Sequence, residues 1–168
     1  RLQVAITFDD GPNDPASLEI ARILDERGSK GTFFLVGKAV EERPDIARQL
    51  VEEGHLVGNH SFHHDYWGWL NPAYPELGAT QEVIGRDAGV CPRFFRPPHG
   101  QRTPLMNAQI ASRGMETVTW DVSAADWVTD DAELVAAGYV PPALERPSYT
   151  ALWRAMRSRQ GAPAAVAA

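Results

Sequence analysis

The sequence predicts an α/β fold in which parallel strands are joined by crossover helices. Short runs of β-branched and aromatic residues alternate with segments whose apolar residues recur at helical spacing. Acidic, histidine and arginine side chains directly follow several of the predicted strands. Parallel sheets carry their sites at that end of the strands, both in open sheets and in closed barrels. The pattern therefore fits either architecture.

The predicted strands are short and mostly apolar, as expected for strands buried on both faces. The first is Val4–Phe8, which leads into two adjacent aspartates. The other predicted strands are 32–36, 56–58, 94–96 and 117–120.

Helix start and stop signals divide the segments between these strands. Asp14 is the expected cap of the first helix, with Pro15 in its first turn and Gly28 at its end. Its expected buried face carries Ile20, Ile23 and Leu24. The second helix is expected from Pro44 to Gly54, with Ile46, Leu50 and Val51 buried. Three more helices are expected, over 76–87, from Thr103 to Gly114, and from Asp130 to Val135.

Length and composition set further bounds. The 168 residues suffice for one domain with a full core, and we expect a single domain over 1–160 and a flexible tail over 161–168. The net charge of −6, without a Lys/Arg run, argues against a nucleic-acid partner. The one cysteine, Cys91, excludes an internal disulfide and is expected to be half-buried. No apolar stretch is long enough to span a bilayer.

Composition does not identify the cellular compartment of the protein. The first residue is Arg1 rather than Met, so a signal peptide or an upstream domain could have preceded it.

Two adjacent carboxylates, Asp9 and Asp10, end the first predicted strand. Holding two like charges side by side is costly unless a cation or a proton intervenes. A turn needs one aspartate at most. The second therefore indicates a metal, a basic partner or a catalytic role.

Three of the five histidines fall within five positions after the strand 56–58. His60 and His64 are four apart, so one helical turn would place both imidazoles on one face, whereas His63 is a poorer third ligand. With Asp10 they form a two-histidine, one-carboxylate set that leaves positions open for water and substrate. A lone histidine would more often be a core or surface residue, and the clustering favours metal binding.

Arginine and tryptophan side chains follow two later strands. Arg96 precedes Pro97 and Pro98, which stiffen the loop. An arginine there can bind a carboxylate and keep it ionised, or it can be a surface residue beside a turn. The segment Trp120–Trp127 could form a sugar-stacking wall with polar anchors, or Trp120 could be a core residue and Asp126 a turn residue.

Four motifs in this order resemble the NodB-homology polysaccharide deacetylases, carbohydrate esterase family 4. The motifs are Thr-Phe-Asp-Asp-Gly-Pro, His-Ser-x-x-His, Arg-Pro-Pro-x-Gly and Asp-Trp, and the match spans residues 4 to 136. The resemblance implies a distorted, incomplete (β/α) barrel. It also implies metal-dependent removal of N-acetyl, sometimes O-acetyl, groups from a glycan such as a chitin-type oligosaccharide or peptidoglycan. A secreted or cell-envelope location follows from such substrates, with the cytoplasm as the alternative.

The resemblance also implies roles for individual residues. Asp10, His60 and His64 would bind a divalent ion, most often zinc, with cobalt or nickel as alternatives. Asp9 would be the general base, and Arg96 matches the arginine that tethers it.

Two further segments match the family less completely. His99, after Pro97, stands where the family usually has a tyrosine whose backbone N–H helps to hold the oxyanion. Asp126 and Trp127 match the Asp-Trp motif, whose aspartate usually orients a catalytic histidine, but Ser123 stands where an aspartate is common.

Aromatic residues follow the histidine motif. They could stack on sugar rings, or they could pack their loop against the barrel. They are Tyr66, Trp67, Trp69 and Tyr74.

The sequence departs from the family towards its end. His99 is the last histidine, so the family's Leu-x-His motif, which supplies the general acid, is missing. About one βα unit, roughly 30 residues, is missing near 137–138. We favour an omitted stretch over a true loss, because deleting a barrel strand would expose an edge and part of the core. Two alternative functions follow: a glycan-binding homologue without the acid, and a hydrolase of a non-sugar amide.

Overall fold

The computed structural model describes residues 4–129 and 131–137. They fall into two compact units, divided in sequence between Thr119 and Trp120, and each unit is described by itself. The expected tail over 161–168 lies outside the described residues. The expected gap near 137–138 falls at their border, so it stays a prediction, as does the single domain over 1–160.

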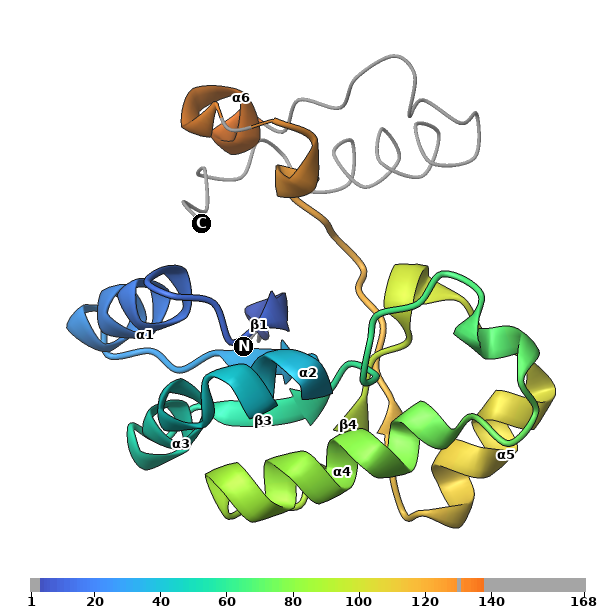
Figure 1. Cartoon of the computed structure of the whole chain (residues 1–168). Coiled ribbons are helices and arrows are strands. Elements are labelled where there is room, and N and C mark those ends of the chain that lie inside the picture. Colours follow the sequence, from blue (N-terminus) through green and yellow to red (C-terminus); the bar gives the residue numbers. More distant parts are fainter. Residues whose placement is uncertain (1–3, 130, 138–168) are drawn as a thin grey trace. The chain divides into compact units, whose positions relative to one another are not determined.

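The first unit is built on five parallel strands (Figure 1). They are β1 (Thr7–Gly11), β2 (Thr32–Leu35), β3 (Leu56–Asn59), β4 (Phe94–Phe95) and β5 (Glu116–Thr117). Their order in the sheet is the order in the chain, and each neighbouring pair is parallel. A doubly wound sheet would reverse its order at a switch point, whereas this sheet is wound in one direction as barrels are.

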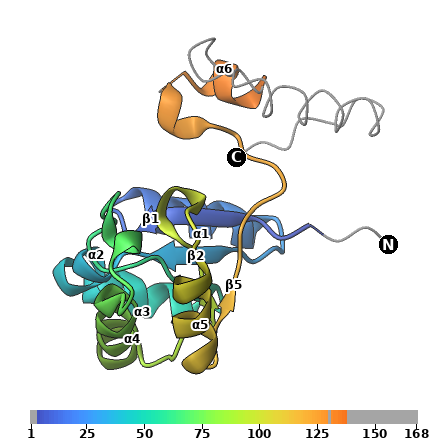
Figure 2. The same ribbon diagram turned by 90° about the vertical axis from the view of Figure 1, so that its right-hand side faces the viewer.

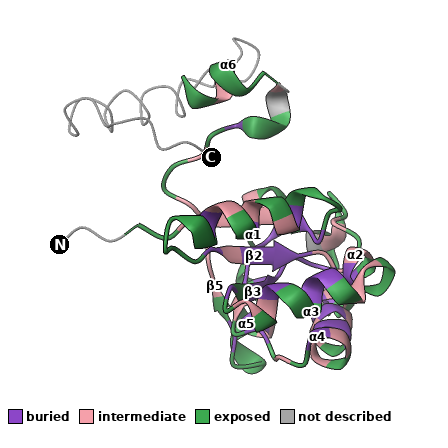
Figure 3. Ribbon diagram, turned by 90° about the vertical axis from the view of Figure 1, so that its left-hand side faces the viewer, coloured by how far each residue is buried: buried purple, intermediate pink, exposed green. Residues whose placement is uncertain are grey.

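Helices join successive strands. They are α1 (Ala16–Glu26), α2 (Gly37–Glu42), α3 (Pro44–Glu52), α4 (Pro75–Ala88) and α5 (Pro104–Ser112), with α6 (Ala132–Ala136) in the second unit. Helix α3 packs between α1 and α4. The core lies between these helices and the strands, where Phe33 and Leu35 of β2 meet Val40, Leu50 and Ile84 (Figure 3). None of the helices in the described part of the chain is long and apolar enough to cross a membrane.

Figure 2 shows the strands β1, β2 and β5 of the first unit from another side. The hydrogen bonds of Arg96 show that the sheet is strongly curved. Arg96 follows β4, yet its Nη1 donates to Thr7 Oγ1 at 2.8 Å and to Asp9 Oδ1 at 2.7 Å, both on β1. Its Nη2 donates to the carbonyl oxygen of Thr119, just beyond β5, at 3.2 Å. In a flat sheet β1 and β4 would lie about 14 Å apart. One side chain can reach both edge strands only if the sheet curls towards closure, which confirms the distorted, incomplete barrel.

Most predicted elements are confirmed within a few residues, but the start of the first strand was wrong. β1 begins at Thr7, and Val4 is exposed. Pairing with β2 begins where the N–H of Thr32 donates to the carbonyl oxygen of Ile6. Asp9 and Asp10 therefore lie within the strand rather than in a turn after it.

Two predicted helix caps need correction. The N-cap of α1 is Pro15 rather than Asp14, and no side chain caps it; instead the Oγ of Ser17 accepts from the N–H of Asn13. Asp130 lies outside the described residues, and Asp131 caps α6. Local spacing alone did not distinguish these neighbouring cap positions.

Three further details of the prediction differ from the structure. Helix α2 was not predicted, since its N-cap, Val36, gives no capping signal. Cys91 is exposed rather than half-buried. Ile20 and Ile23 are only partly buried, because Ser17 and Ala21 share the inner face of α1 with Leu24.

Replacement of Arg96 by methionine should destabilise the fold by about 3 kcal/mol, because it removes the charge that pairs with Asp9 and the bonds between the edge strands. Chemical denaturation of the purified chain measures this change. Arg22→Met, which removes an exposed arginine paired with Glu26 on α1, should change stability little. Equal losses in the two variants would contradict the bridging role of Arg96.

Candidate functional site

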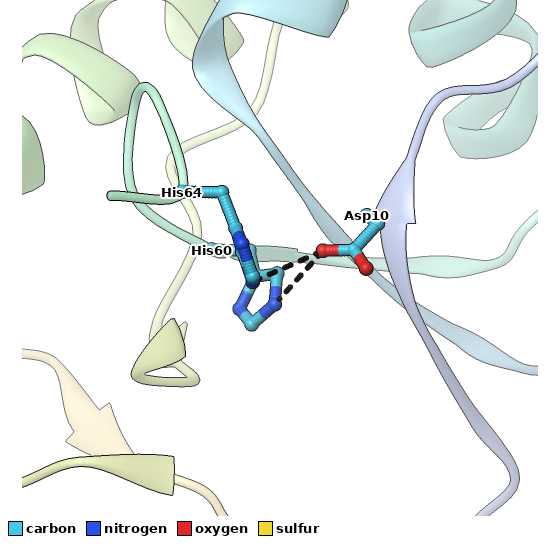
Figure 4. Close-up of side chains that lie close together, drawn as sticks. All are labelled: Asp10, His60 and His64. Atoms are coloured by element: carbon cyan, nitrogen blue, oxygen red, sulfur yellow. Dashed lines mark ion pairs between the residues drawn. The ribbon is translucent and has the colours of Figure 1, made fainter. Parts of the chain in front are cut away.

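The carboxyl ends of three strands bring together residues that are far apart in sequence. Asp9 and Asp10 lie at the end of β1, His60 directly follows β3, and Arg96 directly follows β4. Parallel strands end at the same edge of the sheet, so these side chains converge there. Figure 4 shows Asp10 facing both His60 and His64.

An irregularity in β1 explains how two adjacent aspartates reach one site. Phe8 pairs with Phe33 and Gly11 with Leu35, so two residues of β1 oppose a single residue of β2. This is the arrangement of a β-bulge, which redirects side chains. Asp10 also has a φ of 66°, a left-handed conformation that aspartate tolerates better than most residues.

The predicted metal ligands lie close enough together to share one ion. Asp10 Oδ1 lies 3.3 Å from His60 Nε2 and 3.2 Å from His64 Nε2. All three ligand atoms lie within 4.8 Å of one another. Zinc bonds to nitrogen and oxygen are about 2.0–2.1 Å long, so the edge of a tetrahedron around zinc measures about 3.3 Å. The two distances from Asp10 therefore match the edge of such a tetrahedron, and the nitrogen and oxygen donors suit a divalent ion.

The tautomer of His60 supports the same assignment. Its Nδ1 lies 2.7 Å from the carbonyl oxygen of Arg96, which can only accept, so Nδ1 carries the proton. In a neutral imidazole, Nε2 then keeps a lone pair directed at the Asp10 carboxylate. Two such acceptors repel each other unless a cation or a proton lies between them. Histidine ligands of metals usually donate their other N–H in this way.

The electrostatics keep the ligands in their binding forms. When no metal is bound and a proton lies between His60 Nε2 and Asp10 instead, the resulting hydrogen bond lowers the pKa of Asp10, so this side chain remains a carboxylate. Burial lowers the pKa of His64, which favours the neutral imidazole with a free lone pair.

The loop that presents His64 corrects the prediction of a helical turn. Residues 60–64 are irregular, and Ser61 and His64 have φ angles of 66° and 57°. The N–H of His64 donates to Ser61 Oγ at 3.1 Å. A spacing of four residues therefore suits this folded loop as well as a helix.

Asp9 is held differently from Asp10. Its Oδ1 accepts from Arg96, while its Oδ2 lies 3.8 Å from His60 Nε2. One oxygen is thus fixed and the other faces the candidate metal position. Arg96 is 3% exposed, so the alternative of a surface arginine is wrong.

Histidine, tyrosine and tryptophan rings continue from His64 along one side of the site. His99 lies 4.7 Å from His64 and 4.9 Å from Tyr66, measured between ring centroids, and Tyr66 lies 4.9 Å from Trp67. His99 is exposed, Tyr66 is 50% exposed and Trp67 is 60% exposed. Their faces are thus accessible next to the metal ligands.

The other predicted site residues differ in their surroundings. Tyr74 is only 2% exposed and packs against Phe95, so this ring is a core residue. Pro97 is buried directly after Arg96. Asp126 and Trp127 are exposed on the 3-10 helix η3 (Asp126–Val128) of the second unit, and their roles stay predictions.

A second cluster, Asp25, Glu53 and His55, also has ligand atoms within 4.8 Å of one another, but its chemistry does not fit a metal. His55 Nδ1 accepts from the N–H of Gly31 at 3.1 Å, and burial favours the neutral ring by lowering its pKa. Nε2, which faces Asp25 at 3.6 Å, must then carry the proton and cannot be a ligand. The ammonium of Lys30 also binds Asp25.

Glu76 contacts the site but was not predicted from the sequence. Its carboxylate contacts the loop 60–64 from the first turn of α4. Glutamate is common in first turns, where it complements the helix dipole, so its position carried no distinguishing signal.

The chain is similar to a family of known proteins. The family model for polysaccharide deacetylase matches residues 2–118. A peptidoglycan-N-acetylglucosamine deacetylase of Bacillus cereus is 32% identical over 80% of this chain and 50% of its own length. A chitooligosaccharide deacetylase of Bradyrhizobium sp. is 31% identical over 80% of this chain and 63% of its own length. The chain thus spans half to two thirds of these relatives.

A solved structure shares the fold of the chain. A family 4 carbohydrate esterase of Streptomyces lividans, in complex with acetate, has a TM-score of 0.74 and 31% identity, covering 80% of this chain and 71% of its own.

Replacement of His60 by alanine should weaken zinc binding by more than about 100-fold, because losing a ligand costs more than losing an outer partner. Competition with a chromophoric chelator measures this affinity on metal-stripped protein. His63→Ala should stay within about tenfold of the parent chain, since the His63 ring is turned to Glu76. Undiminished zinc binding by His60→Ala would count against this ligand set.

Proposed function

The chain belongs to the polysaccharide deacetylase family, and from that premise we propose that it is a metal-dependent hydrolase of N-acetylated glycans. Chitin-type oligosaccharides and peptidoglycan are the proposed substrates, as acted on by the two relatives, with O-acetyl groups as a variation. The observation that carries the proposal is the convergence of Asp10, His60 and His64 on one point, with Asp9 beside it. A secreted or cell-envelope location is proposed from the same substrates.

The two aspartates have different roles in the proposed reaction: Asp10 binds the metal ion and Asp9 accepts a proton. When bound by Asp10, His60 and His64, zinc or a similar ion supplies polarisation of the acetyl carbonyl and a lower pKa of water. Asp9 Oδ2, facing that position, takes a proton from the attacking water while Arg96 holds Oδ1. The attack forms the new C–O bond and places negative charge on the acetyl oxygen. The C–N bond then breaks, which releases acetate and an amine, and the amine nitrogen receives the proton that Asp9 took from the water.

The oxygen of the acetyl group needs a hydrogen-bond donor while it carries negative charge. We propose the backbone N–H of His99 for this role. His99 has a φ of 55° and follows the buried Pro97 and Pro98, which restrict its backbone, and its ring lies 4.7 Å from the ring of His64.

The aromatic side chains Tyr66 and Trp67 form the proposed sugar-stacking wall. Both are half exposed and are linked to His64 through the ring of His99. A pyranose ring presents an apolar face that packs well on an aromatic ring. The sugar next to the reacting one is therefore the proposed occupant of this wall.

A second candidate function is glycan binding without turnover. It is favoured by the position of the last histidine, His99, which precedes the segment where the family carries its general acid. Acetate release from chito-oligosaccharide and from peptidoglycan, with added zinc or cobalt, separates the two functions. A chain that binds zinc and glycan without releasing acetate would be the binding homologue.

Replacement of Asp9 by asparagine should lower kcat by about 10²- to 10⁴-fold, because the amide cannot accept the proton of the attacking water. Zinc affinity should be retained, since Asp10 rather than Asp9 is the carboxylate ligand. Acetate release and chelator competition measure the two effects. Retained turnover in Asp9→Asn would refute the assignment of the base.

Replacement of Trp67 by alanine should raise KM for chito-oligosaccharides by about fivefold and leave kcat nearly unchanged, since one stacking contact is lost. The kinetics of acetate release from oligosaccharides of increasing length measure this. Leu105→Ala, at an exposed apolar position on α5, serves as the control. A fall in kcat with unchanged KM would contradict a stacking role.

A further inference from the structure

The loop 60–64, which carries two of the proposed ligands, has a conformation that its own residues do not favour. Ser61 and His64 both have left-handed φ angles, which are unfavourable for residues other than glycine. The loop therefore depends on bonds from other segments to keep His60 and His64 directed at Asp10.

One side of the loop is held by the start of α2. The N–H of Gly37 donates to the carbonyl oxygen of Ser61 at 2.9 Å, and the N–H of Lys38 donates to that of Phe62 at 3.0 Å. These bonds fix the carbonyl groups of Ser61 and Phe62, whereas the N–H groups of Phe62 and His63 need partners from another segment.

Glu76 supplies those partners. Its Oε2 accepts from the N–H groups of Phe62, at 3.1 Å, and His63, at 2.9 Å. Its Oε1 accepts from His63 Nδ1 at 2.7 Å. A single carboxylate thus binds the backbone between the two ligands and turns the His63 ring away from them.

The carboxylate is well placed to act as a rigid clamp. The Glu76 side chain is 18% exposed and lies in the first turn of α4, where the helix dipole favours negative charge. The same turn is anchored by the buried Leu77, and Thr80 Oγ1 donates to the carbonyl oxygen of Glu76 at 2.8 Å.

We propose that Glu76 is a positioning residue of the metal centre and sets its zinc affinity by clamping the loop between His60 and His64. The inference rests on the proposed function, because it takes these histidines as ligands. Glu76 acts through the N–H groups of Phe62 and His63 and does not contact the ion. It also accounts for the exclusion of His63 from the ligand set.

The test measures zinc affinity of the metal-stripped full chain by competition with a chromophoric chelator. Glu76→Ala should weaken binding by about 10- to 100-fold, the usual cost of losing an outer-shell partner. Glu76→Gln keeps an oxygen acceptor but loses the charge, and should weaken binding by about threefold. Glu82→Ala, which removes the same charge from an exposed position of α4, should bind as the parent chain does.

Thermal unfolding of the metal-free variants, followed by circular dichroism, separates positioning from folding. A folded Glu76→Ala variant that binds zinc as tightly as the parent chain would overturn the positioning role and leave the proposed function intact. If Glu76→Ala does not fold, unchanged affinity in Glu76→Gln would overturn the role instead. A parent chain that binds no zinc would refute the metal centre, and the role of Glu76 with it.

Discussion

The buried guanidinium of Arg96 joins the two edges of the sheet and determines its curvature. A buried charge is tolerated only when it is paired and its donors are satisfied. Here the partners come from both edges of the sheet: Thr7 and Asp9 on β1, and the carbonyl oxygens of Val118 and Thr119 after β5. The guanidinium also lies over the ring of Phe34 at 4.1 Å. The sheet has to curl around this group, and an open, flat arrangement would leave it unpaired.

The backbone of Arg96 links the same constraint to the metal centre. Its N–H donates to the carbonyl oxygen of Asn59, and its own carbonyl oxygen accepts from His60 Nδ1. The side chain therefore orients Asp9 while the backbone fixes the tautomer of His60. Because one residue performs both tasks, the relative position of the proposed base and the proposed ligand is set by the pairing of β3 with β4.

The sequence predicted what depends on residue type and spacing. The apolar runs located the strands, and the paired aspartates and clustered histidines located the site. It could not distinguish residues whose roles depend on distant partners. Tyr66 and Tyr74 are chemically identical, yet Tyr74 is buried because it packs against Phe95, which follows it by 21 positions. Arg96 was equally ambiguous, since only the curvature of the sheet brings β1 within its reach.

The separate roles of Asp9 and Asp10 follow from a defect in the first strand. In a regular strand, adjacent side chains point to opposite faces, so only one of the two aspartates could reach the site. The bulge opposite Phe34 and the left-handed φ of Asp10 break this alternation. Asp9 can then bind Arg96 while Asp10 faces His60 and His64. Two like charges are tolerated side by side because each has its own cationic partner: an arginine for Asp9 and the proposed metal ion for Asp10.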